Sequence, residues 1–344
     1  MKCFVTGGSG FIGGHLIREL INQGHRVRAL LRGGSDLRGL HGLDSQHYET
    51  VRGDLLDKES LRSGMAGCDW CFHVAASYHL WLPDYHPMFE TNVDGTQNVM
   101  DAAIAAGCSR IVYTSTVGCI GITHQTGVTE PPADESRDPY PENLSNPYKS
   151  SKWLAELKVR DAIQAGAPIV IVCPTAPVGP ADVKPTPTGK VIVDFLNGKM
   201  PAYLETGLNW VHVCDVAKGH ILAAEKGRLG ERYILGNKEG NWMMKDTFTV
   251  LSDICGLRAP RFKIPYKVAL AAAHIDELIS CFTRKEPKAP LAGVRMAAYR
   301  MFFDPSKAIQ ELGLPQTSPR EALEDAVRWF CENGYVSDRD KINI

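Results

Sequence analysis

The sequence predicts an α/β fold in which a doubly wound parallel sheet is joined to a smaller, mostly helical C-terminal lobe. Three observations support this prediction. Strand-like and helix-like segments alternate over residues 2–173, a glycine-rich turn joins the first strand to the first helix, and five prolines fall within residues 174–187. Strands that alternate with helices of this size form a parallel sheet covered on both faces.

The first half of the chain supplies six strands. Residues 2–6 form a short apolar run, and apolar residues recur at helical spacing over residues 11–21, where Gly24 marks the end of the helix. The other predicted strands are residues 26–32, 48–52, 69–75, 110–115 and 168–173, and the other predicted helices are residues 58–65, 93–106 and 147–165.

The second half is less regular. The proline-rich stretch 174–187 is predicted to be a loop. Helices are expected over residues 191–197 and 215–225, strands over 210–213 and 232–235, and mostly helix after that, ending at 320–333. We assign residues 1–175, with 208–236 returning to them, to the first domain, and residues 176–207 and 237–344 to the lobe.

Composition excludes several classes of function. The formal net charge is −1 over 344 residues, so no strong field attracts nucleic acid. No charged N-terminal region precedes an apolar stretch, and no apolar run approaches the ~20 residues of a membrane span. We expect a cytoplasmic protein whose ten cysteines are mostly buried free thiols, with Cys68 and Cys71 as core residues, and we predict no metal site.

One apolar stretch, residues 268–282, is interrupted by His274, Asp276 and Glu277. It is typical of an amphipathic helix. Such a helix either packs on a neighbour in the lobe or makes peripheral contact with a membrane.

The turn between the first strand and the first helix predicts a dinucleotide site of the Rossmann type. Gly7 permits the tight turn, Gly10 lets the backbone approach a pyrophosphate, and Gly13 lets the helix pack against the strand. Free N–H groups at the helix N-terminus then face the phosphates. The predicted cofactor contacts here are Gly7, Ser9, Gly10, Phe11, Ile12 and Gly13.

The end of the second strand indicates which cofactor is bound. An acid there would bond the adenosine ribose and repel a 2′-phosphate. The sequence instead has Leu31 followed by Arg32. This favours NADP(H), with NAD(H) as the alternative if Arg32 is only a solvated charge. Asp54 is expected to accept a hydrogen bond from adenine, to cap the following helix, or both.

Tyr148 and Lys152 are the candidate catalytic pair. Their i, i+4 spacing places them on one face of a helix. A nearby ammonium would lower the pKa of the tyrosine, which is ~10 when unperturbed, and so favour proton transfer. Lys152 could also bond the nicotinamide ribose. The strand end at Ser115 and Thr116 supplies a hydroxyl to orient a substrate carbonyl.

These segments together resemble the extended short-chain dehydrogenase/reductases of the epimerase/dehydratase type. The shared motifs are T-G-G-S-G-F-I-G at 6–13, G-D-L at 53–55, H-V-A-A at 73–76, N-V-D-G-T at 92–96, Y-T-S-T at 113–116 and Y-K-S-S-K at 148–152. The resemblance implies that Thr116 rather than Ser115 is the catalytic hydroxyl. It also implies cofactor contacts at Leu55, Ala75, Ala76, Asn92, Ser115 and Pro174.

Two branches of this family compete. One contains dihydroflavonol-reductase-like enzymes, and the other contains nucleotide-sugar epimerases. Residues 78–81, 179–189 and 194–198 are similar to a hopanoid-associated sugar epimerase group. Two features argue against a nucleotide-sugar site: Thr175 stands where such epimerases usually have asparagine, and residues 206–210 lack the arginine that would bind a diphosphate, although Lys184, Lys190 or Arg295 could replace it.

The predicted substrate pocket is fairly apolar. Its candidate residues are Ser77, Tyr78, Trp81, Thr175 and Val178, with further apolar surface from Pro177, Phe195 and Trp210.

The function we predict is an NADP(H)-dependent oxidoreductase that reduces a ketone or aldehyde, or oxidises a secondary alcohol, with Tyr148 as acid and base. An epimerase that uses the same residues without net redox change is the alternative. A cofactor-sensing binding protein is the non-enzymatic alternative. The expected partner is a small-molecule substrate, and the resemblance implies a homodimer formed through the helices near residues 93–106 and 147–165.

Overall fold

The computed structural model describes residues 1–43, 46–122, 131–339 and 342. Its centre is a seven-stranded sheet with the order β10-β6-β5-β4-β1-β2-β3. Every neighbouring pair in this sheet is parallel. The strands are β1 (Lys2–Thr6), β2 (Arg26–Leu31), β3 (Tyr48–Arg52), β4 (Trp70–His73), β5 (Arg110–Thr114), β6 (Ile169–Pro174) and β10 (Arg232–Leu235).

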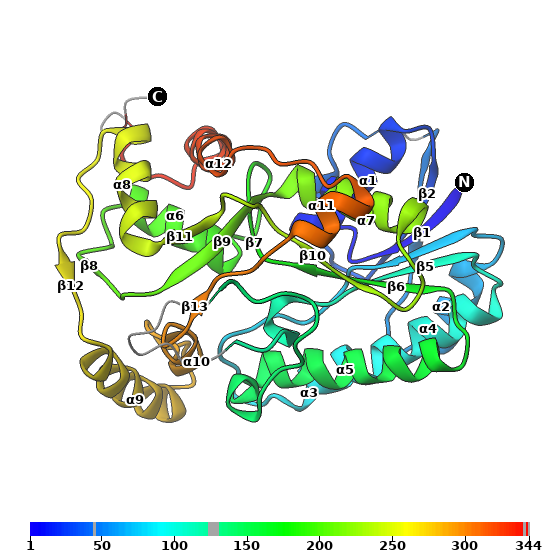
Figure 1. Ribbon diagram of the computed structural model, residues 1–344, viewed down its shortest axis with the longest axis horizontal. Coiled ribbons are helices and arrows are strands. Elements are labelled where there is room, and N and C mark those ends of the chain that lie inside the picture. Colours follow the sequence, from blue (N-terminus) through cyan, green and yellow to red (C-terminus); the bar gives the residue numbers. More distant parts are fainter. Residues whose placement is uncertain (44–45, 123–130, 340–341, 343–344) are drawn as a thin grey trace.

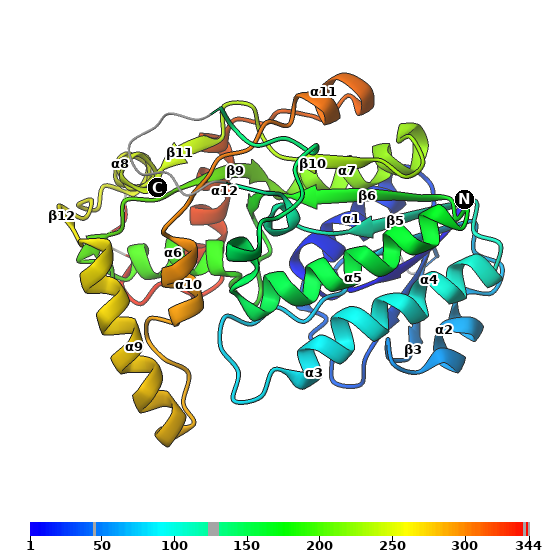
Figure 2. The ribbon, with the colours of Figure 1, turned by 60° about the horizontal axis from the view of Figure 1, so that its bottom comes forward.

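Helices cover both faces of this sheet (Figures 1 and 2). One apolar core lies under α2 (Lys58–Met65), α4 (Gly95–Ala105) and α5 (Pro147–Gln164). A second core lies under α1 (Phe11–Asn22), α7 (Val213–Lys226) and α11 (Ser306–Leu312). The predicted doubly wound α/β fold is confirmed, and the strands bury side chains on both faces, as the apolar runs predict.

The helix predicted to begin at residue 93 begins earlier. A short helix, α3 (His86–Phe89), leads through a π-helical turn, Glu90–Asp94, directly into α4. The turn contains the buried side chain of Asn92. π-Helical turns of this kind frequently occur at functional sites.

The lobe contains its own small sheet, which the sequence analysis did not predict. It consists of β7 (Ala176–Val178), β9 (Gly207–His212), β11 (Asn241–Met243) and β13 (Arg300–Met301). The prediction of a loop over residues 174–187 is therefore wrong at both ends, because β7 lies inside it and α6 (Pro187–Leu196) begins in it. Pro177 is tolerated because β7 pairs only with β9.

The remaining elements of the lobe are mostly helical. They are the pair β8 (Ala202–Tyr203) and β12 (Phe262–Lys263), and the helices α8 (Met244–Cys255), α9 (Tyr266–Thr283), α10 (Leu291–Met296) and α12 (Pro319–Glu332). β9 belongs to the small sheet. The chain after residue 207 therefore packs against the large sheet again only from α7 onward. The carboxyl ends of β1, β4, β5 and β6 lie at one edge of the sheet, where a doubly wound fold binds its ligand.

Candidate active site

The glycine-rich turn has the close contacts that a dinucleotide site requires. A Cβ on Gly13 would lie 2.1 Å from the carbonyl oxygen of Gly7, and one on Gly7 would lie 2.6 Å from the backbone nitrogen of Ala75. A Cβ on Gly10 would meet only Gly7, at 3.2 Å, so this position otherwise faces open space. No side chain caps α1, and its first N–H groups are therefore available to phosphate oxygens. The turn fits a dinucleotide.

A buried chain of hydrogen bonds fixes the strand ends beside this turn. The Oγ1 of Thr6 lies 2.8 Å from Nδ1 of His73, whose Nε2 lies 2.9 Å from Oγ1 of Thr96. The backbone N–H of Ala75 also donates to Thr6, over 3.2 Å. Burial, and then the nearby charge of Lys152, lowers the pKa of His73 to about 3, so this imidazole is neutral and serves to join β1, β4 and α4.

The adenosine end of the predicted site is a hollow of about 460 Å³ at the ends of β2 and β3. Arg32 and Arg52 both line it. The Arg52 guanidinium lies 3.0 Å from the position that a Cβ on Gly33 would take, so it reaches over the turn that follows β2. Neither arginine forms an ion pair with another described residue. The sequence analysis missed Arg52, although the parallel pairing of Leu31 with Arg52 places it beside Arg32.

The motif at residues 53–55 lies next to this hollow. One oxygen of Asp54 accepts from the N–H of Leu56 at 3.0 Å. The cap of α2 is Asp57, which accepts from Glu59 and Ser60, so the expectation that Asp54 caps this helix is wrong. Asp57 prevails because it lies directly before the first helical residue. The side chain of Leu55 is buried in the core against α4.

The structure brings Tyr148, Thr116 and Tyr78 together. The hydroxyl of Thr116 lies near that of Tyr148, where it acts to lower the pKa of the tyrosine, and Thr116 accepts from the N–H of Gly118 at 3.1 Å. The ring of Tyr78 meets that of Tyr148 edge-on, with centroids 4.2 Å apart and planes at 77°. Asn146 holds the start of α5 by accepting from the N–H of Tyr148 at 2.8 Å. The structure therefore brings the hydroxyls of Tyr148 and Thr116 together beside the ring of Tyr78.

Lys152 does not act on Tyr148 as predicted. Its ammonium donates to the carbonyl oxygen of Thr114 at 2.8 Å and lies 4.5 Å above the ring centroid of Tyr113. Burial, followed by the neighbouring Tyr78 and Cys119, raises the pKa of Tyr148 above its ordinary value. The protein alone therefore keeps Tyr148 as a phenol, the form that donates a proton. Burial also lowers the pKa of Lys152 to about 8.

This shift predicts a pH dependence. The charged form of Lys152 prevails below a pH of about 8 and is lost above it, whereas Tyr148 stays protonated throughout this range. We expect kcat/KM for NADPH, which reports groups of the free enzyme, to fall as the pH rises through about 8. Steady-state rates between pH 6 and 10 (the range needed to span the expected midpoint, about two units to each side) test this, with circular dichroism as the control for folding. A constant kcat/KM would contradict the predicted bond between charged Lys152 and the nicotinamide ribose.

Asn92 connects the π-helical turn to both sides of the site. Its amide donates to the carbonyl oxygen of Ser77 at 3.0 Å and to the hydroxyl of Ser151 at 2.9 Å, and it accepts from the N–H of Ser77 at 2.7 Å. All these groups are internal to the protein. Asn92 therefore holds the predicted substrate loop, which begins at Ser77, against α5.

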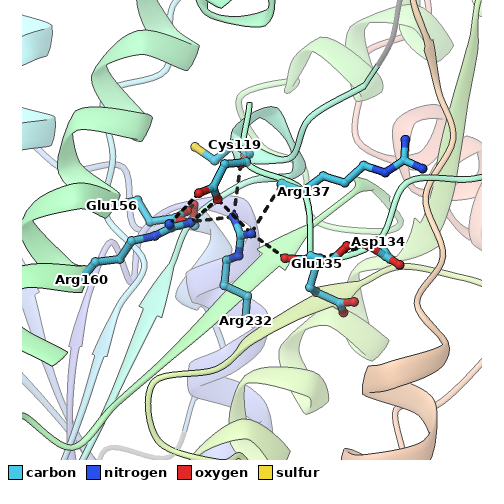
Figure 3. A network of polar contacts seen from close by, with 10 residues as sticks. Cys119, Asp134, Glu135, Arg137, Glu156, Arg160 and Arg232 are labelled. Carbon is cyan, nitrogen blue, oxygen red and sulfur yellow. Dashed lines mark hydrogen bonds and ion pairs between the residues drawn. The ribbon is translucent and has the colours of Figure 1, made fainter. Parts of the chain in front are cut away.

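Ser115 bonds to a polar network around Glu156, Arg160 and Arg232 that the sequence analysis did not find; Figure 3 shows these three residues. Its hydroxyl donates to Glu156, a fully buried carboxylate on the turn of α5 after Lys152. The other oxygen of Glu156 accepts from Arg160 at 2.8 Å and from Arg232 at 3.4 Å. Arg232 also donates to the carbonyl oxygen of Cys119, just beyond Thr116. The hydroxyl of Ser115 therefore holds the catalytic strand end in place.

The predicted substrate residues separate into two groups. Tyr78, Trp81 and Thr175 remain partly exposed at the strand ends, as does Ser77. Val178 packs in the lobe core. Phe195 and Trp210 are also core residues, and the Trp210 indole donates to Thr247 at 2.9 Å, so the expectation that they line the pocket is wrong. Aromatic residues in a core and in a pocket cannot be distinguished by sequence alone.

Other predicted residues lie at the same edge of the sheet. Ala75 is half-buried, Ala76 is exposed, and Pro174 ends β6 as a buried residue. A hollow of about 710 Å³ lies elsewhere. It is lined by polar residues near Arg160 and Arg232 and contains none of the predicted catalytic residues.

Comparison with known proteins supports an enzyme of this type. Residues 3–236 match the NAD dependent epimerase/dehydratase family. A Synechocystis protein named "Putative dihydroflavonol 4-reductase" is 45% identical over 337 residues, which cover 97% of this chain and 95% of the relative. Sterol demethylase protein B of Methylococcus capsulatus is 32% identical and covers 98% and 100%. A 4-hydroxy-2-methyl-3-oxo-4-farnesyl-3,4-dihydroquinoline-1-oxide ketoreductase of Stigmatella aurantiaca is 32% identical and covers 95% and 96%.

Solved structures agree with these relatives. The crystal structure of gox2253 has a TM-score of 0.84 and 42% identity, covering 97% of this chain and 99% of that one. A dTDP-glucose 4,6-dehydratase, DesIV of Streptomyces venezuelae, was solved with NAD bound; it has a TM-score of 0.77 and 26% identity, covering 98% and 100%. The chain belongs to the NAD dependent epimerase/dehydratase family, whose members are nicotinamide-dinucleotide enzymes of the extended short-chain dehydrogenase/reductase type.

Proposed function

We propose that this enzyme is an NADP(H)-dependent oxidoreductase that reduces a ketone or aldehyde to an alcohol. The observation that carries this proposal is the placement of the Tyr148 and Thr116 hydroxyls near each other, with the ring of Tyr78 packed edge-on against that of Tyr148. Two hydroxyls at this spot can hold one carbonyl oxygen. Burial keeps Tyr148 protonated, which suits the donation of a proton in the direction of reduction.

Each residue of the site is assigned one role in this reaction. Bound NADPH supplies a hydride to the carbonyl carbon. Tyr148 donates its proton to the carbonyl oxygen, which completes the alcohol, and Thr116 hydrogen-bonds the same oxygen to orient it. The ammonium of Lys152 already donates to the carbonyl oxygen of Thr114, so we do not assign the proton transfer to it. We propose that Lys152 binds the cofactor ribose.

The substrate we propose is apolar. Tyr78 is partly exposed beside Tyr148, and Trp81, three residues further along the same loop, and Pro177 on β7 are also partly exposed. The printed names of the relatives refer to a dihydroflavonol, a sterol and a farnesyl quinoline. These are bulky ring compounds with extensive apolar surface, which fits a pocket with aromatic walls.

The cofactor preference follows from the two arginines at the adenosine end. Replacing either Arg32 or Arg52 with alanine should raise the KM for NADPH by about 10- to 100-fold, because a charged hydrogen bond to a phosphate contributes about 1.5–3 kcal/mol. The KM for NADH should change little. As a control, Arg62→Ala removes an exposed arginine on α2 that pairs with Glu59. Equal losses with both cofactors would contradict a 2′-phosphate site.

An epimerase would need to hold a nucleotide diphosphate. Of the cations suggested as substitutes for the missing arginine, Lys190 is paired with Asp194 at 2.6 Å. Arg295 is exposed on α10, and Lys184 is exposed near Asp36. None of these three cations is fixed beside Tyr148 by contacts that would form a diphosphate site. We therefore favour net reduction over epimerisation.

We also propose a cytoplasmic homodimer. Every cysteine in the chain is a free thiol in the structure, and eight of the ten are buried, which fits a reducing compartment. For the dimer, α4 and α5 expose Ile104, Leu154 and Leu157. These side chains lie on adjacent helices and could pack against the same surface of a second subunit.

A further inference from the structure

Helix α9 exposes a continuous apolar stripe. Its large members are Val268, Ile275, Leu278, Ile279 and Phe282, which are 59, 61, 61, 54 and 88% exposed. Ala271 and Ala272 are exposed between them. Their spacing of three and four residues places all seven on one face of the helix. Scattered apolar residues are normal on a protein surface, but a continuous row marks an interaction site.

The opposite face of α9 holds the helix to the protein. Only Ala273 and Ser280 are buried, and Ala273 packs with Leu291 and Val294 of α10. In Figure 2 the helix extends away from the body of the molecule, with α10 beside it. The apolar stripe is therefore not needed for packing within the described part of the chain.

The exposed charges of the chain segments before and after α9 are mostly positive. The two acids of α9 are turned toward the protein: Asp276 accepts from the N–H of Ala289 at 2.9 Å, and Glu277 lies near Tyr85. The stripe itself has no acidic side chain. The chain segments directly before and after α9 carry exposed cations that outnumber their one exposed acid, Glu286; they are Arg258, Arg261, Lys267, Arg284, Lys285 and Lys288.

We propose that α9 docks this enzyme on the surface of an anionic lipid bilayer. Apolar side chains on one face with cations at the rim are the pattern of a helix that lies in the membrane interface. No helix in the described ranges is long and apolar enough to cross a bilayer, so α9 would lie on the membrane rather than span it. An interface with a protein partner or a second copy would not require this excess of exposed cations before and after α9.

The segment that follows α9 lies beside the candidate active site. A Cβ on Gly293 of α10 would lie 3.5 Å from Leu80, in the predicted substrate loop. The sulfur of Met296 accepts from Asn146, the cap of α5, at 3.2 Å. The segment that follows α9 thus contacts both the loop of Tyr78 and the start of the helix that carries Tyr148. Docking would place this side of the candidate active site near the bilayer, where apolar compounds partition.

Vesicle flotation tests the docking surface, and it does not depend on the proposed reaction. The full-length protein should float with vesicles of phosphatidylcholine mixed with phosphatidylglycerol and should float much less with phosphatidylcholine alone. Leu278→Asp and Ile279→Asp should each weaken binding about tenfold or more, because each removes a buried aliphatic side chain from the interface. Arg284→Glu with Lys285→Glu should weaken binding to the anionic vesicles only. The matched control is Leu229→Asp, which changes a 53% exposed leucine between α7 and β10.

Two results would overturn the proposal. One is a wild-type protein that stays with neither vesicle while it oxidises NADPH normally, which would leave the proposed function standing. The other is a Leu278→Asp variant that floats like the wild type but has a lower molar mass in light scattering, since α9 would then contact a second copy. All substituted side chains are already solvent-exposed, so circular dichroism should show unchanged folding.

Discussion

Replacing Tyr148 with phenylalanine should lower kcat for carbonyl reduction by about a thousandfold, within the range of 10²–10⁴ that general acid catalysis contributes. The affinity for NADPH should stay nearly unchanged. The variant keeps the aromatic ring that meets Tyr78 at 4.2 Å, and so keeps the packing of the site. It loses the proton that Tyr148 is proposed to transfer. Steady-state rates and a fluorescence titration with NADPH measure the two effects separately.

Tyr78→Phe is the matched control for this change. It also removes one phenol hydroxyl from the same pair of rings, but from the residue to which we assign no proton transfer. We expect a loss in kcat of less than about tenfold, since the hydroxyl contributes at most a hydrogen bond of ~1 kcal/mol. If Tyr148→Phe retains turnover, or if both variants lose it equally, the assignment of Tyr148 as the acid is wrong.

Replacing Glu156 with alanine should lower the free energy of unfolding by about 3–5 kcal/mol, because removing one partner of a buried ion pair leaves the other charges uncompensated. Glu156 is fully buried and bonds Arg160 at 2.8 Å, Arg232 at 3.4 Å and the hydroxyl of Ser115. As Figure 3 shows, both guanidinium groups converge on this one carboxylate. Urea unfolding followed by circular dichroism gives the free energy.

Two further variants interpret this result. Glu156→Gln keeps the shape and some of the hydrogen bonds, so its loss should be smaller. Glu324→Ala removes the acid of an exposed i, i+4 pair with Arg320 and should change stability by less than ~1 kcal/mol. Because Glu156 holds Ser115 next to Thr116, Glu156→Gln should also lower kcat while leaving the affinity for NADPH unchanged. A stability loss in Glu156→Ala no larger than in Glu324→Ala would contradict the network.

The large sheet could be predicted because its strands are buried on both faces. All six residues of β6 are buried, and they appear in the sequence as an unbroken apolar run. The small sheet of the lobe has no such signal. Its strands have two to six residues, and Pro177 in β7 reads as a loop residue unless its pairing partner β9 is known.

The candidate site could be predicted where its residues are close in sequence. Tyr148 and Lys152 share one helix face, and Thr116 ends a strand that the apolar pattern identifies. Glu156 lies one turn after Lys152, but its partner Arg232 is distant in sequence, so the carboxylate reads as a solvated charge. The raised pKa of Tyr148 could not be predicted either, because it depends on burial and on the neighbouring Tyr78 and Cys119.

The most direct test of the account follows nicotinamide absorbance while the purified enzyme is given a panel of apolar ketones and aldehydes. The account predicts that NADPH is oxidised in a one-to-one ratio with the alcohol formed, and faster than NADH. An enzyme that carries tightly bound cofactor and converts a sugar nucleotide into its isomer, with no net change in absorbance, would contradict it.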